Sequence, residues 1–241
     1  MRSEAPLVLR PTVLVRGEPA GDRPQAARVS VAAGAAGPVG GDELSLDVDV
    51  GAGSTLVLGE ISARLLLPGP HGERSRSSST ARVGSGSTFV WLPQPMIAAT
   101  GCRHLNEVIV SLADDARLLL REEILLGRHG EQPGTLAQHV RVQLAGRPLY
   151  DQRLDFGPDA TGWDSPAVVG TDRALGSVLV VDPAWASDGP PPARPLGEDA
   201  AVLPLAGPAV LICAVSPDSL ALRNALTAGL RSLGPPWAPP V

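Results

Sequence analysis

The sequence predicts an all-β protein with about one to two α-helices, one of them near the C-terminus. Three observations support this fold class: strict two-residue alternation of apolar and polar side chains, a strand-turn-strand unit that recurs about every 30 residues, and one well-marked helix late in the chain. With 241 residues, the chain lies within the range of single-domain all-β folds. We therefore expect one domain over residues 1–241, built as a layered or helical stack of hairpins.

The alternation is clearest in residues 43–50, where ELSLDVDV places apolar and polar side chains on opposite sides. This pattern is typical of a strand with one buried face. The small residues at 51–54 then signal a turn, and the apolar run at 55–58 reads as a second strand. The segment predicts a hairpin.

The same unit returns along the chain. Its copies start at Val50, Val83, Leu112 and Leu144, which are 33, 29 and 32 residues apart. Repeats of this size that bury an apolar face on their neighbours are typical of stacked folds. An alternative is that such short matches reflect only the general pattern of antiparallel hairpins. The polar residues 70–79 and the proline- and glycine-rich residues 182–199 are expected to be flexible surface loops.

A helix is predicted from Ser216, as its N-cap, to Gly234, which together with Pro235 ends it. Its apolar face is formed by leucines at spacings of four, four and three, namely Leu222, Leu226, Leu230 and Leu233. The tail at residues 235–241 shows no periodicity, and we expect it to be flexible.

The composition excludes several classes of protein. All 20 basic residues are arginine, so the chain lacks the lysine that a P-loop NTPase, a kinase or a Schiff-base enzyme requires. The net charge of −5, with charges of both signs interspersed, argues against nucleic-acid binding. The longest apolar stretch, at 200–215, is too short and too interrupted by proline to span a membrane. Two cysteines far apart in the sequence fit a reducing cytoplasm.

Enzymatic chemistry has few candidate residues. The four histidines show no metal-ligand spacing, and the Cys102–His104 pair lacks an orienting third group. Glu122 and Glu123 are adjacent on a predicted strand and therefore point to opposite faces. The inward one is either functional or paired with an arginine such as Arg121 or Arg128.

Two alternative classes follow from these residues. One is a solenoid-like β polysaccharide hydrolase or lyase that uses Glu122 or Glu123 with Asp42 as its acid and base. Sugar sites favour exposed aromatic residues, and the chain has seven aromatic residues in all (Trp 4, Tyr 1, Phe 2). The other is a plain β-sandwich binding module, which the recurring unit disfavours.

Three segments in this order resemble the UreD (UreH) family of urease accessory proteins: GPVGGDEL at 37–44, WLPQP at 91–95 and REEILLGR at 121–128. A weaker likeness continues through 148–154 and 202–208, so the resemblance covers a core of about residues 37–232. The matching positions with a structural role are Gly40, Gly41, Trp91, Gln94, Gly127 and Arg128.

The resemblance implies a non-catalytic cytoplasmic scaffold that helps load nickel into apo-urease. Its implied partners are the urease subunits, UreF and, through UreF, the GTPase UreG. No tightly bound cofactor is implied; nickel would be in transit through an internal, water-filled path, with Asp42 and Glu122 at path positions. The sequence also allows Asp42 to cap its own Gly-Gly-Asp turn.

Two positions depart from the family pattern. Ala63 and Arg64 stand where relatives usually carry a lysine with aromatic and basic neighbours. Gln152 stands where another acid is often found. The path implied by the resemblance is therefore only partly reproduced in this chain.

Overall fold

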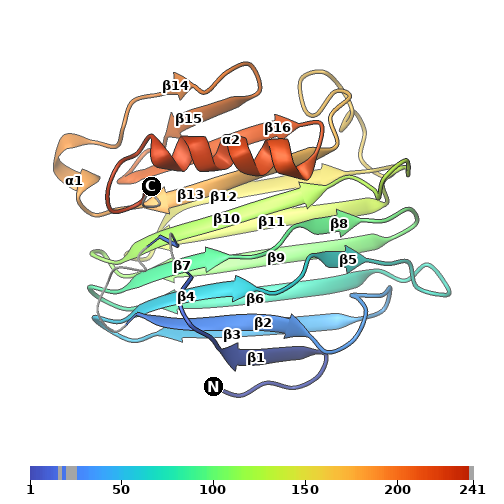
Figure 1. The fold of residues 1–241 in the computed structure, drawn as a ribbon, viewed down its shortest axis with the longest axis horizontal. Helices are drawn as coiled ribbons and strands as arrows, with labels where there is room; N and C mark the ends of the chain where they lie inside the picture. Colours follow the sequence, from blue (N-terminus) through green and yellow to red (C-terminus); the bar gives the residue numbers. More distant parts are fainter. Residues whose placement is uncertain (16–17, 20–25, 239–241) are drawn as a thin grey trace.

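A computed structural model describes residues 1–15, 18–19 and 26–238, and it confirms the all-β prediction. Two sheets of 11 and 5 strands lie face to face. The helix α2 (Ser219–Arg231) covers the outer side of the larger sheet (Figure 1). Among the described residues, no helix has the length and apolarity needed to cross a membrane.

The larger sheet has this spatial order: β1 (Leu7–Pro11), β2 (Ala27–Ala33), β4 (Thr55–Glu60), β7 (Thr88–Leu92), β10 (Arg117–Leu125), β13 (Ala174–Val181), β16 (Ala209–Ser216), β15 (Ala200–Pro204) and β14 (Arg194–Pro195). Two short strands, β5 (Arg64–Leu66) and β8 (Met96–Ala98), extend it beside β10. The smaller sheet has the order β12 (Arg147–Phe156), β11 (Thr135–Leu144), β9 (Arg103–Leu112), β6 (Ser75–Val83) and β3 (Glu43–Val50). A one-turn helix, α1 (Trp185–Asp188), lies between β13 and β14.

The predicted repeat is confirmed by the strand register. Val50 lies beside Val83, Val83 beside Leu112 and Leu112 beside Leu144. These are the four positions from which the repeat was measured in the sequence. The layered stack is therefore a parallel arrangement of equivalent strands, in which each unit packs on the next.

The first three units are not hairpins, however. In each, the first strand lies in the smaller sheet and the second in the larger sheet, so the turn passes from one sheet to the other. Of the four units, the last one, β11 and β12, does form an antiparallel hairpin. A hairpin and a turn between sheets share the same local sequence of strand, turn and strand, and only pairing with neighbouring units distinguishes them.

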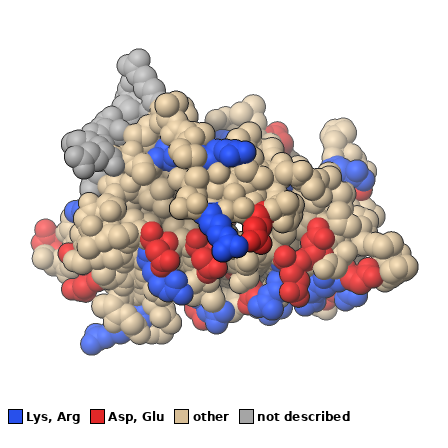
Figure 2. Space-filling view, turned by 90° about the horizontal axis from the view of Figure 1, so that it is seen from below, with Lys and Arg blue, Asp and Glu red and all other residues tan. Residues whose placement is uncertain are grey.

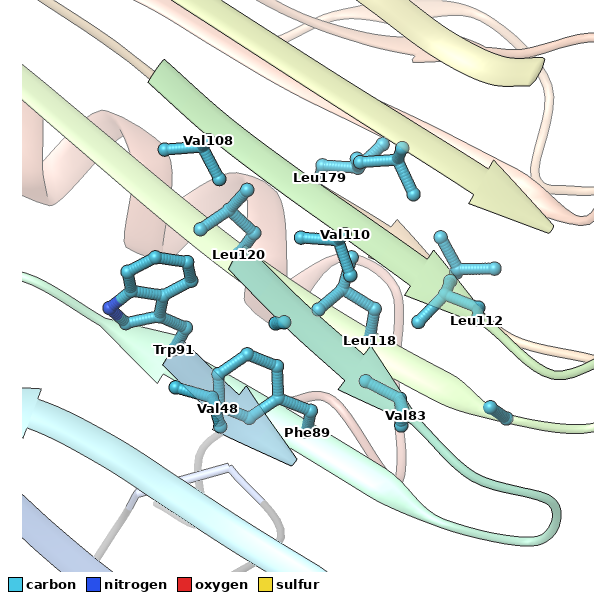
Figure 3. Packing of buried hydrophobic residues seen from close by; sticks show 14 of the residues in the cluster. Val48, Val83, Phe89, Trp91, Val108, Val110, Leu112, Leu118, Leu120 and Leu179 are labelled. Atoms are coloured by element: carbon cyan, nitrogen blue, oxygen red, sulfur yellow. The ribbon is translucent and has the colours of Figure 1, made fainter. Parts of the chain in front are cut away.

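The space between the sheets is filled mainly by apolar side chains from both layers (Figure 3). Phe89 and Trp91 of β7 pack together with ring centroids 5.7 Å apart. The opposite faces of β7 and β10 contribute Val90 and Leu119 to a second cluster beneath α2. The central strands of the larger sheet are thus covered on both faces.

The predicted helix forms, but it begins later than expected. Asp218, not Ser216, is the N-cap; its carboxylate accepts hydrogen bonds from the backbone of Leu220 and Ala221. Ser216 is instead the last residue of β16. The pairing of β16 with β13 continues to that point and delays the start of the helix.

Part of the tail that we expect to be flexible packs on the domain in this structure; residues 239–241 lie outside the described part. Trp237 is buried, and its indole Nε1 donates a 2.8 Å hydrogen bond to Asp182 Oδ2. Asp182 is itself buried and also pairs with Arg117 at 3.2 Å. A large apolar ring with a satisfied polar atom fixes this segment on the domain.

The segment at 70–79 also differs from its expected loop. Strand β6 begins at Ser75, and Ser75, Ser77 and Ser79 point into the space between the sheets. Small polar residues are typical of loops. Here they occupy the inner face of a strand.

A buried ion pair fastens α2 to the larger sheet. The guanidinium of Arg223 on α2 donates to both carboxylate oxygens of Glu123 on β10, at 2.6 to 3.2 Å. Arg121 Nε lies 3.1 Å from Glu123 Oε1, and Arg121 Nη2 donates to the Pro93 carbonyl at 3.2 Å. The Glu123 side chain is 0% exposed, so two arginines compensate one fully buried charge.

We therefore predict that Glu123→Gln destabilises the fold by about 3 kcal/mol, because it leaves Arg121 and Arg223 without their anion. Chemical denaturation measures the loss directly. Arg82→Gln is the control, since its pair with Asp49 is exposed on both sides and its loss should leave the midpoint unchanged. Equal midpoints for Glu123→Gln and the unmodified chain would contradict the anchoring role.

Candidate functional site

A line of polar side chains runs between the two sheets through an otherwise apolar core. We call it the polar seam; its members are Glu60 (β4), Arg64 (β5), Ser75 and Ser77 (β6), His104 and Asn106 (β9), Glu122 (β10) and Gln138 (β11). Five of the eight are fully buried, namely Ser75, Ser77, His104, Asn106 and Gln138. The seam is positioned by the repeat, since Ser77, Asn106 and Gln138 occupy matching places on neighbouring parallel strands.

Contacts join the seam from one end to the other. Glu60 Oε1 lies 3.4 Å from Arg64 Nε, and Arg64 Nη1 donates to Asn106 Oδ1 at 3.5 Å. Asn106 Nδ2 donates to Gln138 Oε1 at 2.8 Å, and Gln138 Nε2 donates to Glu122 Oε1. A continuous polar connection therefore links β4 with β10 inside the molecule.

Several polar atoms of this region are buried without a hydrogen-bond partner among the described residues. They are Arg64 Nε, Ser77 Oγ, Trp91 Nε1 and His104 Nε2. A buried polar group without a partner is costly, and internal water ordinarily supplies the missing bond. The seam is therefore the part of the core that we expect to be hydrated.

A cavity adjoins each end of the seam. At the Glu122 end, a cavity of about 100 Å³ is lined by Glu122, Ile124, Gln138, Gln152, Leu154, Leu175, Gly176, Ser177, Leu211 and Cys213. At the other end, a smaller cavity of about 30 Å³ borders Glu60, Arg64, Ser77 and Trp91. The first has room for a few water molecules.

Burial sets the protonation states along the seam. It raises the pKa of Glu122 to about 7, although the charge of Arg64 and the hydrogen bond from Gln138 offset part of the rise. Burial, with the nearby charge of Arg64, lowers the pKa of His104 to about 3, so its imidazole is neutral. Burial also raises the pKa of the Cys213 thiol in the larger cavity. Glu122 is thus the seam acid that exchanges its proton near neutral pH.

The two adjacent acids of β10 do point to opposite faces, as the alternation predicts, but both faces are covered. The sequence allows an arginine partner, such as Arg121, for the acid that points inward. In the structure Arg121 pairs with Glu123, and Glu122 points to the other face, between the sheets. Arg128 pairs with Glu131 at 2.7 Å on the surface. Glu122 receives only the neutral amide of Gln138 and faces the cavity.

Asp42 lies away from this cavity. Its Oδ2 accepts a 2.8 Å hydrogen bond from the Val39 backbone, and its own N–H donates to the Val39 carbonyl at 2.9 Å. These bonds close the turn that leads into β3. Gly40 is tightly packed in the same turn, because a Cβ there would lie 2.4 Å from the Gly69 nitrogen. Gly41, with a φ of +94°, adopts the conformation that favours glycine.

The acid and base proposed for a hydrolase, Asp42 and Glu122, are therefore not brought to a common cavity. In the described part of the chain, no group of three or more His, Cys, Asp and Glu side chains is arranged to hold a metal ion. The polar seam instead contains amide, hydroxyl and carboxylate oxygens, the ligand types that suit hard divalent cations.

The other motif residues have structural contacts. Trp91 packs on Phe89, as expected for a strand tryptophan. Gln94 joins three elements: its backbone N–H donates to Glu60, its side-chain amide nitrogen to the Glu60 carbonyl, and its amide oxygen accepts from Arg223. Gly127 has a φ of +85°, and a Cβ there would lie 2.6 Å from the Glu131 carbonyl oxygen.

The two departures from the family pattern fall in different places. Ala63 is exposed, whereas its neighbour Arg64 enters the seam. Gln152 lines the same cavity as Glu122 and accepts a 2.6 Å hydrogen bond from Tyr150. An amide therefore stands beside Glu122, at the position where the family resemblance implies a second acid.

The sequence reasoning missed most of the seam, namely Ser75, Ser77, His104, Asn106 and Gln138. A signal for them exists: once the repeats are aligned on Val83, Leu112 and Leu144, Ser77, Asn106 and Gln138 coincide. Polar residues that recur at one inward position of a stack indicate a polar ladder inside the core.

Comparison with known proteins gives a consistent family. A family model described as UreD urease accessory protein matches residues 1–239. The chain is 44% identical over 214 residues to Urease accessory protein UreD 2 of Saccharopolyspora erythraea, covering 87% of this chain and 75% of the relative. It is 43% identical to UreD 3 of Streptomyces griseus and 42% identical to UreD of Streptomyces coelicolor, with 97% of this chain and 89% of each relative covered.

The shifted pKa of Glu122 predicts a pH-dependent stability. The unfolded chain loses this proton near pH 4.5 and the folded chain near pH 7, so stability falls as pH rises through that window and stays low above it. Glu122→Gln removes the penalty. The substitution should therefore change the free energy of unfolding more favourably at about pH 8 than at about pH 4.5, and the difference should be on the order of 2 kcal/mol.

Thermal melting at both pH values tests this, with the exposed Asp155→Asn as control. A stability difference between Glu122→Gln and the unmodified chain that does not change with pH would show that Glu122 titrates normally.

Proposed function

The chain belongs to the UreD family of urease accessory proteins, and we propose that it is a scaffold that binds apo-urease and assists nickel insertion into its active site. The family is one of accessory proteins rather than of catalytic enzymes. The proposed partners are the urease subunits, UreF and, through UreF, the GTPase UreG, in the cytoplasm. The absence of lysine supports this division of labour, because nucleotide hydrolysis by a P-loop enzyme has to come from another chain.

The observation that supports a role in nickel transfer is the polar seam with its two cavities. We propose that Ni²⁺, as cargo, passes along this connection between the sheets. Its oxygens replace part of the hydration shell of the ion without holding it tightly, whereas clusters of cysteine and histidine would retain it. The seam side chains without protein partners support the presence of water, which a hydrated ion also requires.

Glu122 is the central residue of this proposal. It lies where the seam meets the larger cavity, beside Gln138, Gln152 and Ser177. At the other end of the seam, Glu60 is paired with Arg64 at 3.4 Å, whereas the described contacts of Glu122 are with the neutral amide of Gln138. The metal contact is therefore assigned to the Glu122 end.

Nickel and a proton compete for Glu122. With a pKa of about 7, the carboxyl group has to lose its proton before its oxygens bind a cation. Transfer is therefore favoured as pH rises above 7. The hydrolase alternative finds no comparable support, because its acid and base do not share a cavity.

Glu122→Gln should lower the nickel content of matured urease several-fold, because the amide keeps the shape and hydrogen-bonding capacity of the side chain but removes its charge. Binding to UreF should survive, since the substitution is internal. Urease matured with the variant is assayed for nickel by mass spectrometry and for activity, with Asp155→Asn on the outer face as control. Normal nickel content with Glu122→Gln would refute the path.

Asp42→Asn separates the path role of Asp42 from its turn role. The asparagine oxygen still accepts the Val39 hydrogen bond, so we expect unchanged stability and unchanged nickel content. Asp42→Ala should instead lower stability by about 1 kcal/mol, because the Val39 N–H loses its partner. Loss of nickel with Asp42→Asn at full stability would assign Asp42 to the path.

A further inference from the structure

Strand β3 forms a free edge of the smaller sheet. It pairs with β6 on one side, and no strand of the described chain pairs with its other side. With 8 residues, no proline and an uninterrupted register, it is a long and regular edge. Natural edges usually carry a bulge, a proline or charged side chains that prevent further pairing; of these, β3 has charged side chains, all acidic and on its outer face. In contrast, the edge strand β1 ends in Pro11, and β14 has only 2 residues.

The hydrogen bonds of β3 show which backbone groups remain free. The Asp42 carbonyl accepts from Arg76 N–H and the Val50 carbonyl from Gly84 N–H, so even-numbered residues face β6. In a parallel ladder, successive residues direct their backbone groups to opposite sides. The N–H and C=O groups of residues 43, 45, 47 and 49 therefore face the open side.

Next to this edge lies a groove of about 500 Å³ between β3 and the N-terminal residues 2–9. Its inner walls carry four partly buried leucines from the two layers, Leu7, Leu9, Leu44 and Leu46. They extend the inter-sheet core to the surface, where the sandwich is open. A strand added to β3 would place every second side chain on these leucines.

The solvent side of the same edge is acidic. The groove is lined by Arg2, Glu4, Glu43 and Asp47, which gives a net charge of −2 (one basic and three acidic residues). Arg2 and Glu4 pair with each other at 2.9 Å, which leaves the excess charge on Glu43 and Asp47. Figure 2 looks onto this edge of the molecule and shows acidic and basic side chains interspersed in the lower half of the view.

The negative charge of this edge indicates which kind of strand can pair with β3. Two copies of the chain that paired through β3 would bring acidic side chains of one edge against those of the other, which is destabilising. A strand with arginine or lysine on its outer side would instead neutralise Glu43 and Asp47. We propose that the free edge of β3 binds an extended segment of a partner protein in which apolar and basic residues alternate.

Because the groove lies next to the small cavity at one end of the polar seam, a strand bound to β3 would also affect the seam. Leu7, Leu44 and Leu46 line both the groove and the small cavity at the Glu60–Arg64 end of the seam. A strand seated on β3 would cover the surface outside that cavity. Partner binding would thereby close one end of the polar seam to solvent.

The test uses the immobilised full-length chain and a peptide as long as β3, 8 residues, that alternates valine and arginine. We expect the peptide to bind, and binding to weaken as salt rises from about 0.05 to about 0.5 M. Ser45→Pro removes one free edge N–H and should weaken binding at least about tenfold. Ser45→Ala, which keeps that N–H, should bind normally. Asp47→Asn should weaken binding about two- to five-fold.

Two further probes keep the outcome decisive if Ser45→Pro folds poorly. The same peptide with N-methyl groups on alternate backbone nitrogens, and a peptide with glutamate in place of arginine, should both fail to bind. Equal binding by the N-methylated peptide, or no binding by the unmodified one, would overturn the proposal. Dimers of the free chain that Ser45→Pro dissociates, seen by light scattering, would assign the edge to a second copy and equally overturn it.

Discussion

The cost of burying two neighbouring carboxylates in one strand governs much of this structure. Because β10 is covered on both faces, Glu123 is fully buried and Glu122 is partly buried, and each is accommodated differently. Glu123 pairs with Arg121 and Arg223 and thereby fixes α2 to the sheet. Glu122 meets a neutral amide and a cavity, so its pKa rises to about 7. Glu123 stabilises the fold, whereas Glu122 can exchange its proton near neutral pH.

The parallel repeat determines where an acid such as Glu122 can lie between the sheets beside neutral polar side chains. The register that stacks Val83 on Leu112 and Leu144 also stacks Ser77 on Asn106 and Gln138, which lie earlier on the same three strands. Polar residues at equivalent places of successive units then form a connected line rather than isolated defects. The connected line of polar side chains between the sheets is therefore a property of the repeat. The open β3 edge arises in the same way, because a stack of parallel units ends in an unpaired strand.

The sequence allows much of the fold to be predicted, since alternation in residues 43–50 and the spacing of Val50, Val83, Leu112 and Leu144 depend on local periodicity. It does not reveal which sheet each strand joins, because that depends on pairing between units far apart in the chain. The site was predicted only in part, through Glu122 and its family likeness. The local sequence at Ser75 and Ser77 is typical of a loop, because the role of these residues comes from partners such as His104, which lies 2.8 Å from Ser75 Oγ. Trp237 was missed for the same reason, because its anchor, Asp182, lies 55 residues away.

The proposed nickel path requires that the polar seam between the sheets is hydrated along its length up to Glu122. High-resolution crystallography of the full chain, with ordered waters located between the sheets, tests it most directly. The account predicts water within hydrogen-bonding distance of Ser77 Oγ and His104 Nε2, and water in the cavity beside Glu122 and Gln152. A dry seam, in which these atoms bond directly to other side chains and apolar groups fill the cavity, would contradict it.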